Sequence, residues 1–202
     1  MVPSEPVNEK EETRVGRIVV TEFMSLDGVV EDPGGAEDFK HSGWSFEISR
    51  GEEGDQFKLD ETMSSDALLL GRVTYEGFAK AWPTRDGEFA DKFNTMPKYV
   101  VSSTLENPEW NNSTVLNGDV AEEVGKLRQE LDGDIVVHGS PQLVQALVDN
   151  DLVDELRLMV FPVVLGTGKG LFGETSDKKT LRLVDSKVVG DGVAILIYEP
   201  AS

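Results

Sequence analysis

The chain has 202 residues and a mass of 22.1 kDa, which fits one domain of ordinary size. It contains no cysteine and only two histidines, His41 and His138, so disulfides, thiolate metal sites and multi-histidine metal centres are excluded within one chain. The net charge of −19, from 38 acidic and 19 basic residues, disfavours binding to nucleic acid or to an anionic membrane surface.

The first 14 residues, MVPSEPVNEKEETR, are polar and acidic, unlike a signal peptide, and they show no apolar periodicity. We expect a disordered tail over 1–14 and a single domain over 15–202. The longest apolar stretch, 156–165, contains Arg157 and Pro162 and is too short to cross a bilayer. The expected protein is therefore cytoplasmic and has no membrane or nucleic-acid partner.

Apolar runs rich in Val, Ile and Phe alternate with helical patterns along the rest of the chain. Asp119 fits the N-cap of one helix, Ser140 followed by Pro141 is typical of another helix start, and Gly190-Asp191-Gly192 is typical of a hairpin turn. In chain order, the patterns predict a strand over 17–26, an irregular loop over 31–50, a helix over 51–64, a strand over 67–70, a helix over 72–82, strands over 98–102 and 114–116, a helix over 119–131, a strand over 134–137, a helix over 140–150, and strands over 152–160, 181–189 and 193–198.

This alternation predicts an α/β fold with a mainly parallel central sheet, helices on both faces and an antiparallel hairpin at the C-terminal end. In such sheets, ligands bind beyond the carboxyl ends of the strands. The residues that directly follow each strand are therefore the first place to look for functional groups. The loop over 31–50 is long for a compact domain, which is typical of functional or mobile segments.

Three strand ends carry groups suited to phosphate binding. Gly71-Arg72-Val73-Thr74 joins a strand to a helix, so N–H groups at the helix start, a guanidinium and a hydroxyl can meet an anion. His138-Gly139-Ser140 is a second strand end that leads into a helix, and Ser102-Ser103-Thr104 places three hydroxyls after a third strand. Each motif also has an ordinary explanation, because glycine is common in turns and Ser140 fits a helix cap.

Taken together, two helix starts and a hydroxyl-rich strand end favour a ligand with two or more phosphate groups. A dinucleotide that carries a 2′-phosphate fits this description, with Arg72 as its charged partner. The chain has neither G-x-G-x-x-G after its first strand nor a P-loop. Gly166-Thr167-Gly168-Lys169-Gly170 is only superficially similar to a phosphate loop, because no clear helix follows it.

Five short motifs follow one another over 17–198: Met24-Ser25-Leu26-Asp27-Gly28; Leu70-Gly71-Arg72-x-Thr74-Tyr75-Glu76; Val100-Val101-Ser102-Ser103; Val137-His138-Gly139-Ser140; and Pro162-x-x-Leu165-Gly166-x-Gly168-x-x-Leu171-Phe172. In this order they resemble the dihydrofolate reductase superfamily. They resemble more closely the C-terminal reductase domain of the bifunctional riboflavin-biosynthesis deaminase/reductase, in its stand-alone bacterial form. The resemblance implies a dihydrofolate-reductase-like fold, NADPH as the cofactor and a homodimer.

The resemblance also implies where NADPH contacts the chain. The classical folate enzymes carry a second glycine where this chain has His138 or Ser140, and a structural role for His138 stays open. The implied contacts are Gly71, Arg72 and Thr74 for the adenosine phosphates, Ser102 and Ser103 for the adenine ribose and its 2′-phosphate, His138, Gly139 and Ser140 for the pyrophosphate, and Phe23 for the nicotinamide.

On the substrate side, Asp27 follows the first strand, where a carboxyl group could deliver the proton that hydride transfer to a C=N or C=O group requires. Asp-Gly is also a standard turn pair, so a purely structural role for Asp27 stays open. Trp44, in the long loop, could stack on a flat heterocycle or hold the loop against the core. The residues expected near the substrate are Ser25, Trp44, Leu165, Gly166 and Gly168, and no metal ligand is expected.

Folate reductases carry their key carboxylate on the helix after the long loop. The pattern over 51–64 singles out none of the acids present there, so dihydrofolate is not the leading substrate. These acids are Glu52, Glu53, Asp55, Asp60 and Glu61. Arg85 and Lys169 are candidates to meet a substrate phosphate.

The leading hypothesis is an NADPH-dependent reductase of a small heterocycle, and the best-named substrate is 5-amino-6-(5-phosphoribosylamino)uracil. The deaminase half is missing, because its zinc site needs cysteines. Two alternatives stay open: a pteridine, dihydrofolate or xenobiotic reductase on the same fold, and a non-catalytic NADPH-binding dimeric protein. In a homodimer, the segment 156–165 and the terminal hairpin would extend the sheet across a two-fold axis.

Overall fold

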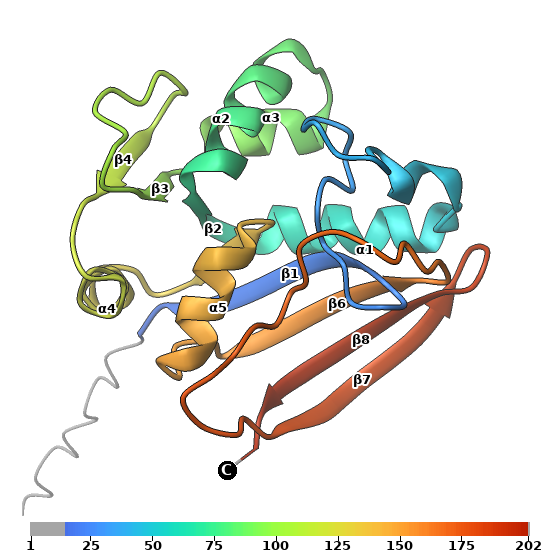
Figure 1. The fold of residues 1–202 in the computed structure, drawn as a ribbon. Helices are drawn as coiled ribbons and strands as arrows, with labels where there is room; N and C mark the ends of the chain where they lie inside the picture. The colour runs from blue at the N-terminus through green and yellow to red at the C-terminus, as the bar shows by residue number, and fades with distance from the viewer. Residues whose placement is uncertain (1–14, 202) are drawn as a thin grey trace, which may run out of the picture.

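An eight-stranded sheet runs through the computed structural model, which describes residues 15–201 (Figure 1). The strand order is β4-β3-β2-β5-β1-β6-β8-β7. The first six strands in this order are parallel, whereas β8 is antiparallel to β6 and β7 is antiparallel to β8. The strands are β1 Arg17–Ser25, β2 Ser65–Gly71, β3 Lys98–Val101, β4 Ser113–Leu116, β5 Asp134–His138, β6 Glu155–Phe161, β7 Leu181–Val189 and β8 Val193–Pro200. The tail predicted over 1–14 lies outside the described residues.

Helices cover both faces of the sheet because side chains alternate between the faces along each strand. Ile18 and Val20 of β1 pack with α4 (Val120–Glu130) and α5 (Pro141–Asp149). On the opposite face, Leu68 and Leu70 of β2 pack with α2 (Arg72–Ala81) and α3 (Glu88–Thr95). The predicted α/β class, with a mainly parallel sheet and a terminal antiparallel hairpin, is confirmed.

The remaining helix, α1 (Gly51–Ser64), lies on the same face as α2 and α3. Its Phe57 packs in a third cluster with side chains of β1, β6 and β8. Part of the segment 31–50 joins this cluster. Trp44, in a short 3-10 helix (Trp44–Glu47), is 2% exposed, and its ring meets the edge of Phe161 at 5.4 Å between centroids. The long loop is therefore anchored to the core through a tryptophan.

Most predicted elements are confirmed, but one helix was not predicted and one capping prediction is wrong. Helix α3 was not predicted, because its eight residues form only two turns around Ala90 and Phe93. Asp119 caps α4 as predicted, accepting from the backbone N–H of Ala121 at 3.0 Å. Ser140 does not cap α5 with its side chain: its backbone is left-handed, with φ of 59°, and its hydroxyl is used elsewhere.

Candidate functional site

The predicted cofactor residues follow neighbouring strands, so they lie along the carboxyl-terminal edge of the sheet, where the parallel strands end. The strands β3, β2, β5 and β1 are consecutive in the sheet. The first three end near Ser102, Gly71 and Gly139, and β1 reaches Phe23 just after its pairing with β5 stops. Neighbouring strands lie about 4.8 Å apart, so these four positions extend over about 14 Å. The structure therefore brings together the strand-end motifs that the sequence separates.

At the centre of this edge, the starts of α2 and α5 hold each other. The backbone N–H of Gly71 donates to the Ser140 hydroxyl at 2.9 Å, and the backbone N–H of Ser140 donates to the Thr74 hydroxyl at 2.9 Å. Gly139 has φ of +56°, and a Cβ there would lie 3.1 Å from the Thr74 hydroxyl oxygen. Glycine is thus required for both the turn and the close approach. We call this pair of hydrogen bonds the α2–α5 clasp.

Two groups stay accessible beside the clasp. The Arg72 side chain is 45% exposed, and its guanidinium pairs with Glu76 one turn along the helix at 3.0 Å. The Ser102 hydroxyl accepts from the backbone N–H of Thr104 at 3.1 Å, so it shapes the turn after β3. Ser103 is exposed. An anion at this edge would therefore meet Arg72 and the Ser103 hydroxyl.

Asp27 connects the end of β1 to a distant loop. Its carboxylate accepts from the Ser25 hydroxyl at 2.7 Å and from the backbone N–H groups of Leu165 and Gly166 at 3.1 and 2.8 Å. The Ser25 hydroxyl, followed by the two N–H groups, lowers the pKa of Asp27 to about 2. Asp27 is therefore an ionised clamp at neutral pH, which favours the structural alternative over a proton donor.

The other residues expected near the substrate have packing roles in this structure. Ser25 is fully buried, and its hydroxyl also accepts from the backbone N–H of Val29 at 2.9 Å. Trp44 donates its indole N–H to the carbonyl of Glu31 at 2.9 Å, deep in the third cluster. Gly168 has φ of +121°, and a Cβ there would lie 2.5 Å from Val29. Leu165 and Gly166 do lie beside Asp27, as the preceding contacts show.

A buried lysine lies under the end of β1, and the sequence analysis did not single it out. The ammonium of Lys58 in α1 donates to the Thr21 hydroxyl at 2.7 Å and pairs with Glu61. It also lies 5.5 Å from the centre of the Phe23 ring, which is half-buried. The available signal was its spacing, since Lys58 and Glu61 are three residues apart on one face of a helix.

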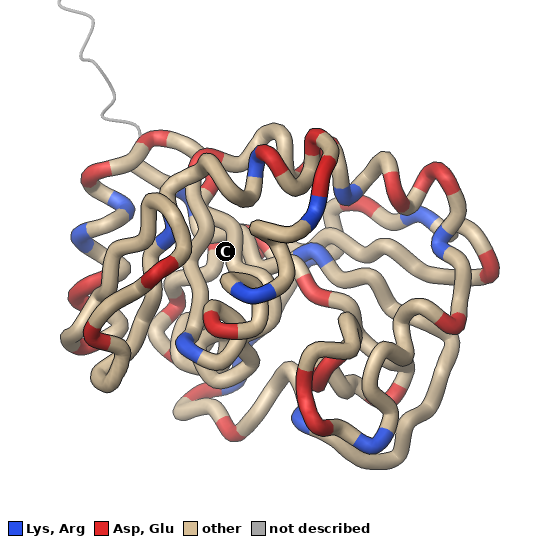
Figure 2. Tube along the Cα trace, turned by 90° about the horizontal axis from the view of Figure 1, so that it is seen from above, with Lys and Arg blue, Asp and Glu red and all other residues tan. Residues whose placement is uncertain are grey.

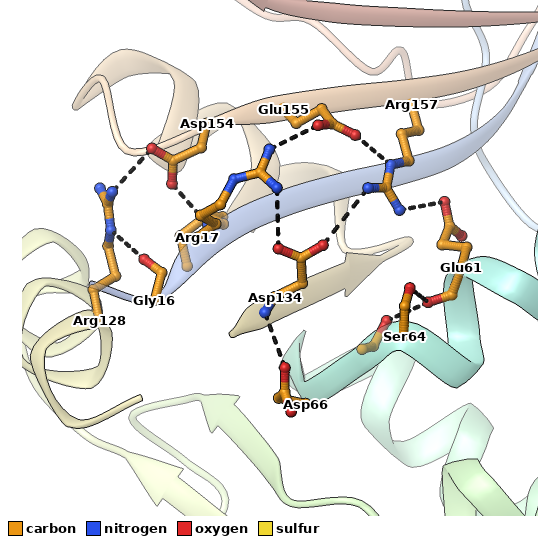
Figure 3. A network of polar contacts seen from close by, with 12 residues as sticks. Gly16, Arg17, Glu61, Ser64, Asp66, Arg128, Asp134, Asp154, Glu155 and Arg157 are labelled. Carbon is orange, nitrogen blue, oxygen red and sulfur yellow. Dashed lines mark hydrogen bonds and ion pairs between the residues drawn. The ribbon is translucent and has the colours of Figure 1, made fainter. Parts of the chain in front are cut away.

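An ionic network extends from Glu61 across the amino-terminal ends of β5, β1 and β6 (Figure 3). Arg157 of β6 lies 3.5 Å from Glu61 and 3.6 Å from Asp134, and it also binds Glu155. Arg17 of β1 joins Glu155 at 2.7 Å. Of the acids on α1, only Glu61 is buried, and it is bound by cations on both sides.

Two further titratable groups lie where β1 separates from β5. Burial raises the pKa of Glu22 well above its ordinary value, although the charge of Lys58 and the N–H of Gly139 oppose this. Burial, followed by the charge of Lys58, lowers the pKa of His138 well below its ordinary value. The His138 ring packs between Phe78 and Phe93, with centroids 6.4 and 5.3 Å away. A neutral, structural His138 is therefore favoured.

A groove of about 710 Å³ lies elsewhere, between α2, α3 and the segment before β4. None of the predicted cofactor or substrate residues lines it, so it is not assigned to the site. Its larger apolar lining residues are Tyr75, Pro83, Leu105 and Trp110.

The Asp27 clamp makes a testable prediction about pH. The backbone amide resonances of Leu165 and Gly166 should titrate with a midpoint of about 2 in an NMR pH series, because the carboxylate they bind has that pKa. The contribution of these bonds to stability is present above the ordinary pKa of 3.8 and is lost as the pH falls through about 2. Ser25→Ala should move the midpoint up toward 3.8, and Asp27→Asn should abolish the titration. A midpoint near 3.8 in the unmodified protein would contradict the clamp.

Comparisons with known proteins identify relatives of this chain. The curated relatives include two uncharacterized proteins of Bacillus subtilis (strain 168): YyaP, 29% identical over 90% of this chain and 94% of its own length, and YwjB, 30% identical over 85% and 91%. The helices of the described residues include none that is long and apolar enough to cross a membrane.

Solved structures with this fold include a putative riboflavin biosynthesis protein from Shewanella sp. PV-4, with a TM-score of 0.75, 22% identity, and coverage of 92% of this chain and 99% of that one. RibD from Acinetobacter baumannii has a TM-score of 0.64 and 16% identity, and the match covers 94% of this chain and 59% of that one. Dihydrofolate reductase from Enterococcus faecalis complexed with NADP(H) has a TM-score of 0.55 and 14% identity, and the match covers 92% of this chain and 97% of that one. The model of the RibD C-terminal domain matches residues 17–195. The expected resemblance is confirmed, and the chain belongs to the RibD C-terminal domain family, with a reductase fold.

Proposed function

We propose that this protein is an NADPH-dependent reductase of a small heterocyclic compound. The observation that carries the proposal is the α2–α5 clasp, which places two helix starts together at the middle of the edge with Arg72 beside them. A phosphorylated dinucleotide needs such a local set of donors here. Asp and Glu are spread around the molecule rather than confined to one face (Figure 2), and the global field opposes anions.

The residues present fit this cofactor. Arg72 and Ser103 would meet the 2′-phosphate. The Thr74 hydroxyl, whose oxygen accepts in the clasp, would donate its proton to the adenosine phosphates at the start of α2, where Gly71 allows close approach of the backbone. The Arg72–Glu76 pair is exposed and therefore costs little to break when a phosphate competes for the guanidinium. Phe23 provides an aromatic surface at the end of β1, where the nicotinamide would lie.

When bound, the reduced nicotinamide supplies a hydride, and the chain itself supplies charge and position. Lys58 is held by Glu61 and Thr21, so its ammonium is fixed beneath the Phe23 end of the edge. A fixed cation there would stabilise negative charge that develops on a reduced C=O or C=N group. Asp27 holds the loop at Leu165 and Gly166 in place as one wall of the substrate site.

The arrangement of α1 favours a pyrimidine-type substrate over a folate. A folate reductase needs a free carboxylate from this helix, whereas Glu61 is already bound by Lys58 and Arg157. The pyrimidine intermediate of riboflavin synthesis is therefore our first choice of substrate, and a pteridine or xenobiotic is the second.

The two candidates for a substrate phosphate contact other side chains in this structure. Lys169 pairs with Glu31 at 2.7 Å, and the Arg85 guanidinium lies 4.6 Å above the Trp82 ring.

A substrate panel tests the proposed function directly. NADPH oxidation should be measured with the phosphoribosylaminouracil, with a dihydropterin and with a quinone, at equal protein concentration. We expect turnover with the uracil compound. Turnover only with the pterin or quinone would favour the alternative reductases, and tight NADPH binding without turnover on any of them would favour a non-catalytic NADPH-binding protein.

Arg72 provides a test of cofactor choice. Arg72→Ala should weaken NADPH binding by about 1.5–3 kcal/mol, the usual range for a hydrogen bond to a charged group, and should barely change NADH binding. Fluorescence titration with both cofactors measures this difference. Lys80→Ala, at the other end of the same helix, is the control and should change neither affinity. Equal losses for both cofactors would assign Arg72 to the pyrophosphate instead.

We further propose that a second copy of the chain covers the C-terminal hairpin. The segment 156–165 cannot extend a sheet across a dimer as expected, because β6 is flanked by β1 and β8 and has no free edge. β7 is the edge strand, and all its residues except Val189 are exposed. Its register places Leu183 beside Tyr198 and Val188 beside Ala194, so these side chains share one apolar face.

The hairpin face makes a prediction about mass. Light scattering should give twice the 22.1 kDa chain mass, and the double variant Leu183→Glu/Val188→Glu should give the monomer mass, because buried unpaired carboxylates oppose association. Met63→Glu, which alters an exposed apolar residue on α1, is the control and should stay dimeric. A monomer mass for the unmodified protein would reject the dimer.

A further inference from the structure

The end of β1 forms a fork in the sheet. β1 pairs with β5 up to Thr21 opposite His138, but it continues alongside β6 to Ser25. Glu22 is the first residue past the point of separation. The fork lies on the edge of the sheet that carries the predicted cofactor residues, because β5 is followed there by Gly139 and by Ser140 of the α2–α5 clasp.

Glu22 is an unusual residue for a central strand. It is 3% exposed, and one of its carboxyl oxygens, Oε1, has no hydrogen-bond partner among the described residues. The backbone N–H of Gly139 acts on this carboxyl group and opposes the rise of its pKa. Burying a polar atom without a partner is unfavourable, and an aliphatic side chain would avoid this cost. A missing partner that arrives with a ligand would explain why the carboxyl group is there.

The surroundings determine which ligand atoms fit. The charged groups that act on Glu22 are Lys58 and Glu61, both from α1. His138, the last residue of β5, precedes Gly139 in the chain. Burial is the largest influence on Glu22 and raises its pKa well above its ordinary value, which favours the protonated carboxyl group. A protonated Oε1 can donate a hydrogen bond to a carbonyl or hydroxyl oxygen of a ligand.

We propose that Oε1 of Glu22 is a ligand contact that donates a hydrogen bond to an oxygen in the nicotinamide half of the bound cofactor. This inference rests on the proposed function. The phosphate-binding groups belong to α2 and to the start of α5, whereas Glu22 lies one strand further along the edge, next to Phe23. The acceptors in that half are the carboxamide oxygen and the ribose hydroxyls, which share the chemistry that Glu22 offers.

Two substitutions at Glu22 separate ligand binding from folding. Glu22→Leu removes the donor but keeps the site apolar, so we expect NADPH affinity to fall by about tenfold or more while the thermal midpoint is unchanged or higher. Glu22→Gln preserves the shape and donates from its amide, so its affinity should stay within about threefold of the unmodified protein. Calorimetric titration with NADPH and thermal unfolding of the free protein measure both quantities.

A matched control is available on α1. Thr62 is 1% exposed, and its hydroxyl also has no partner among the described residues, so Thr62→Val removes a buried unpaired polar group away from the fork. It should leave NADPH affinity unchanged. Repeating the titrations with the thionicotinamide analogue distinguishes the two acceptors: the loss caused by Glu22→Leu should shrink if the carboxamide oxygen is the partner and persist if a ribose hydroxyl is.

NADPH binding by the unmodified protein tests the proposed function, and NADPH binding by the Glu22 variants tests the Glu22 contact. If the unmodified protein binds NADPH and Glu22→Leu binds it equally well, the contact is rejected and the proposed function stands. If Glu22→Leu does not fold, Glu22→Gln decides: near-normal affinity supports a neutral donor, and a loss of more than about tenfold in a folded variant rejects it. If the unmodified protein does not bind NADPH, both proposals fail.

Discussion

The unequal pairing of β1 is the constraint on which the rest of this structure depends. Residues 19–21 are paired with both β5 and β6, whereas residues 22–25 are paired with β6 alone. A parallel sheet with continuous pairing would leave no place for a ligand between its strands. By stopping at His138, β5 leaves β1 unpaired on this side next to Phe23, whose ring centre lies 5.5 Å from the Lys58 ammonium. The site is thus produced by strand lengths as much as by side-chain chemistry.

Buried charge is the second feature of this molecule. The chain is strongly acidic overall, yet the buried ammonium of Lys58 and the half-buried guanidinium of Arg157 both contact the buried carboxylate of Glu61. Buried ion pairs contribute little net stability, because desolvation cancels much of their attraction. The Glu61–Arg157 pair joins α1 to β6, so it favours one arrangement of this helix over the sheet.

The sequence was sufficient for the frame of the site but not for its interior. Apolar runs and glycine turns identified β1, β2 and β5, and the rule about carboxyl ends then located Gly71 and Gly139 correctly on one edge. Local patterns could not show that the Ser140 hydroxyl bonds to Gly71 across 69 residues rather than capping its own helix. Pairing of Lys58 with Thr21, and the isolation of Glu22, likewise depend on which elements meet in space.

Trp44 is a residue for which the local sequence suggested a ligand contact, whereas the fold shows a packing role. An aromatic residue in a long loop is a reasonable candidate for a ligand contact. Only its packing against Phe161 shows that Trp44 belongs to the core. Asp27 is similar, because its partners Leu165 and Gly166 come from the far end of the chain. Short-range sequence patterns report what a residue can do. The long-range contacts of the fold determine which of these possibilities is used.

The position of β1 in the sheet has a consequence for biosynthesis. Among the strands of the described residues, β1 is the first to leave the ribosome, but neither of its neighbours begins until Asp134 and Glu155 have been added. Until then, this apolar strand lacks both of the partners that it has in the folded sheet. Such a nascent chain is exposed to aggregation and is a natural client for chaperones, so the yield of protein made in cells should depend on their supply.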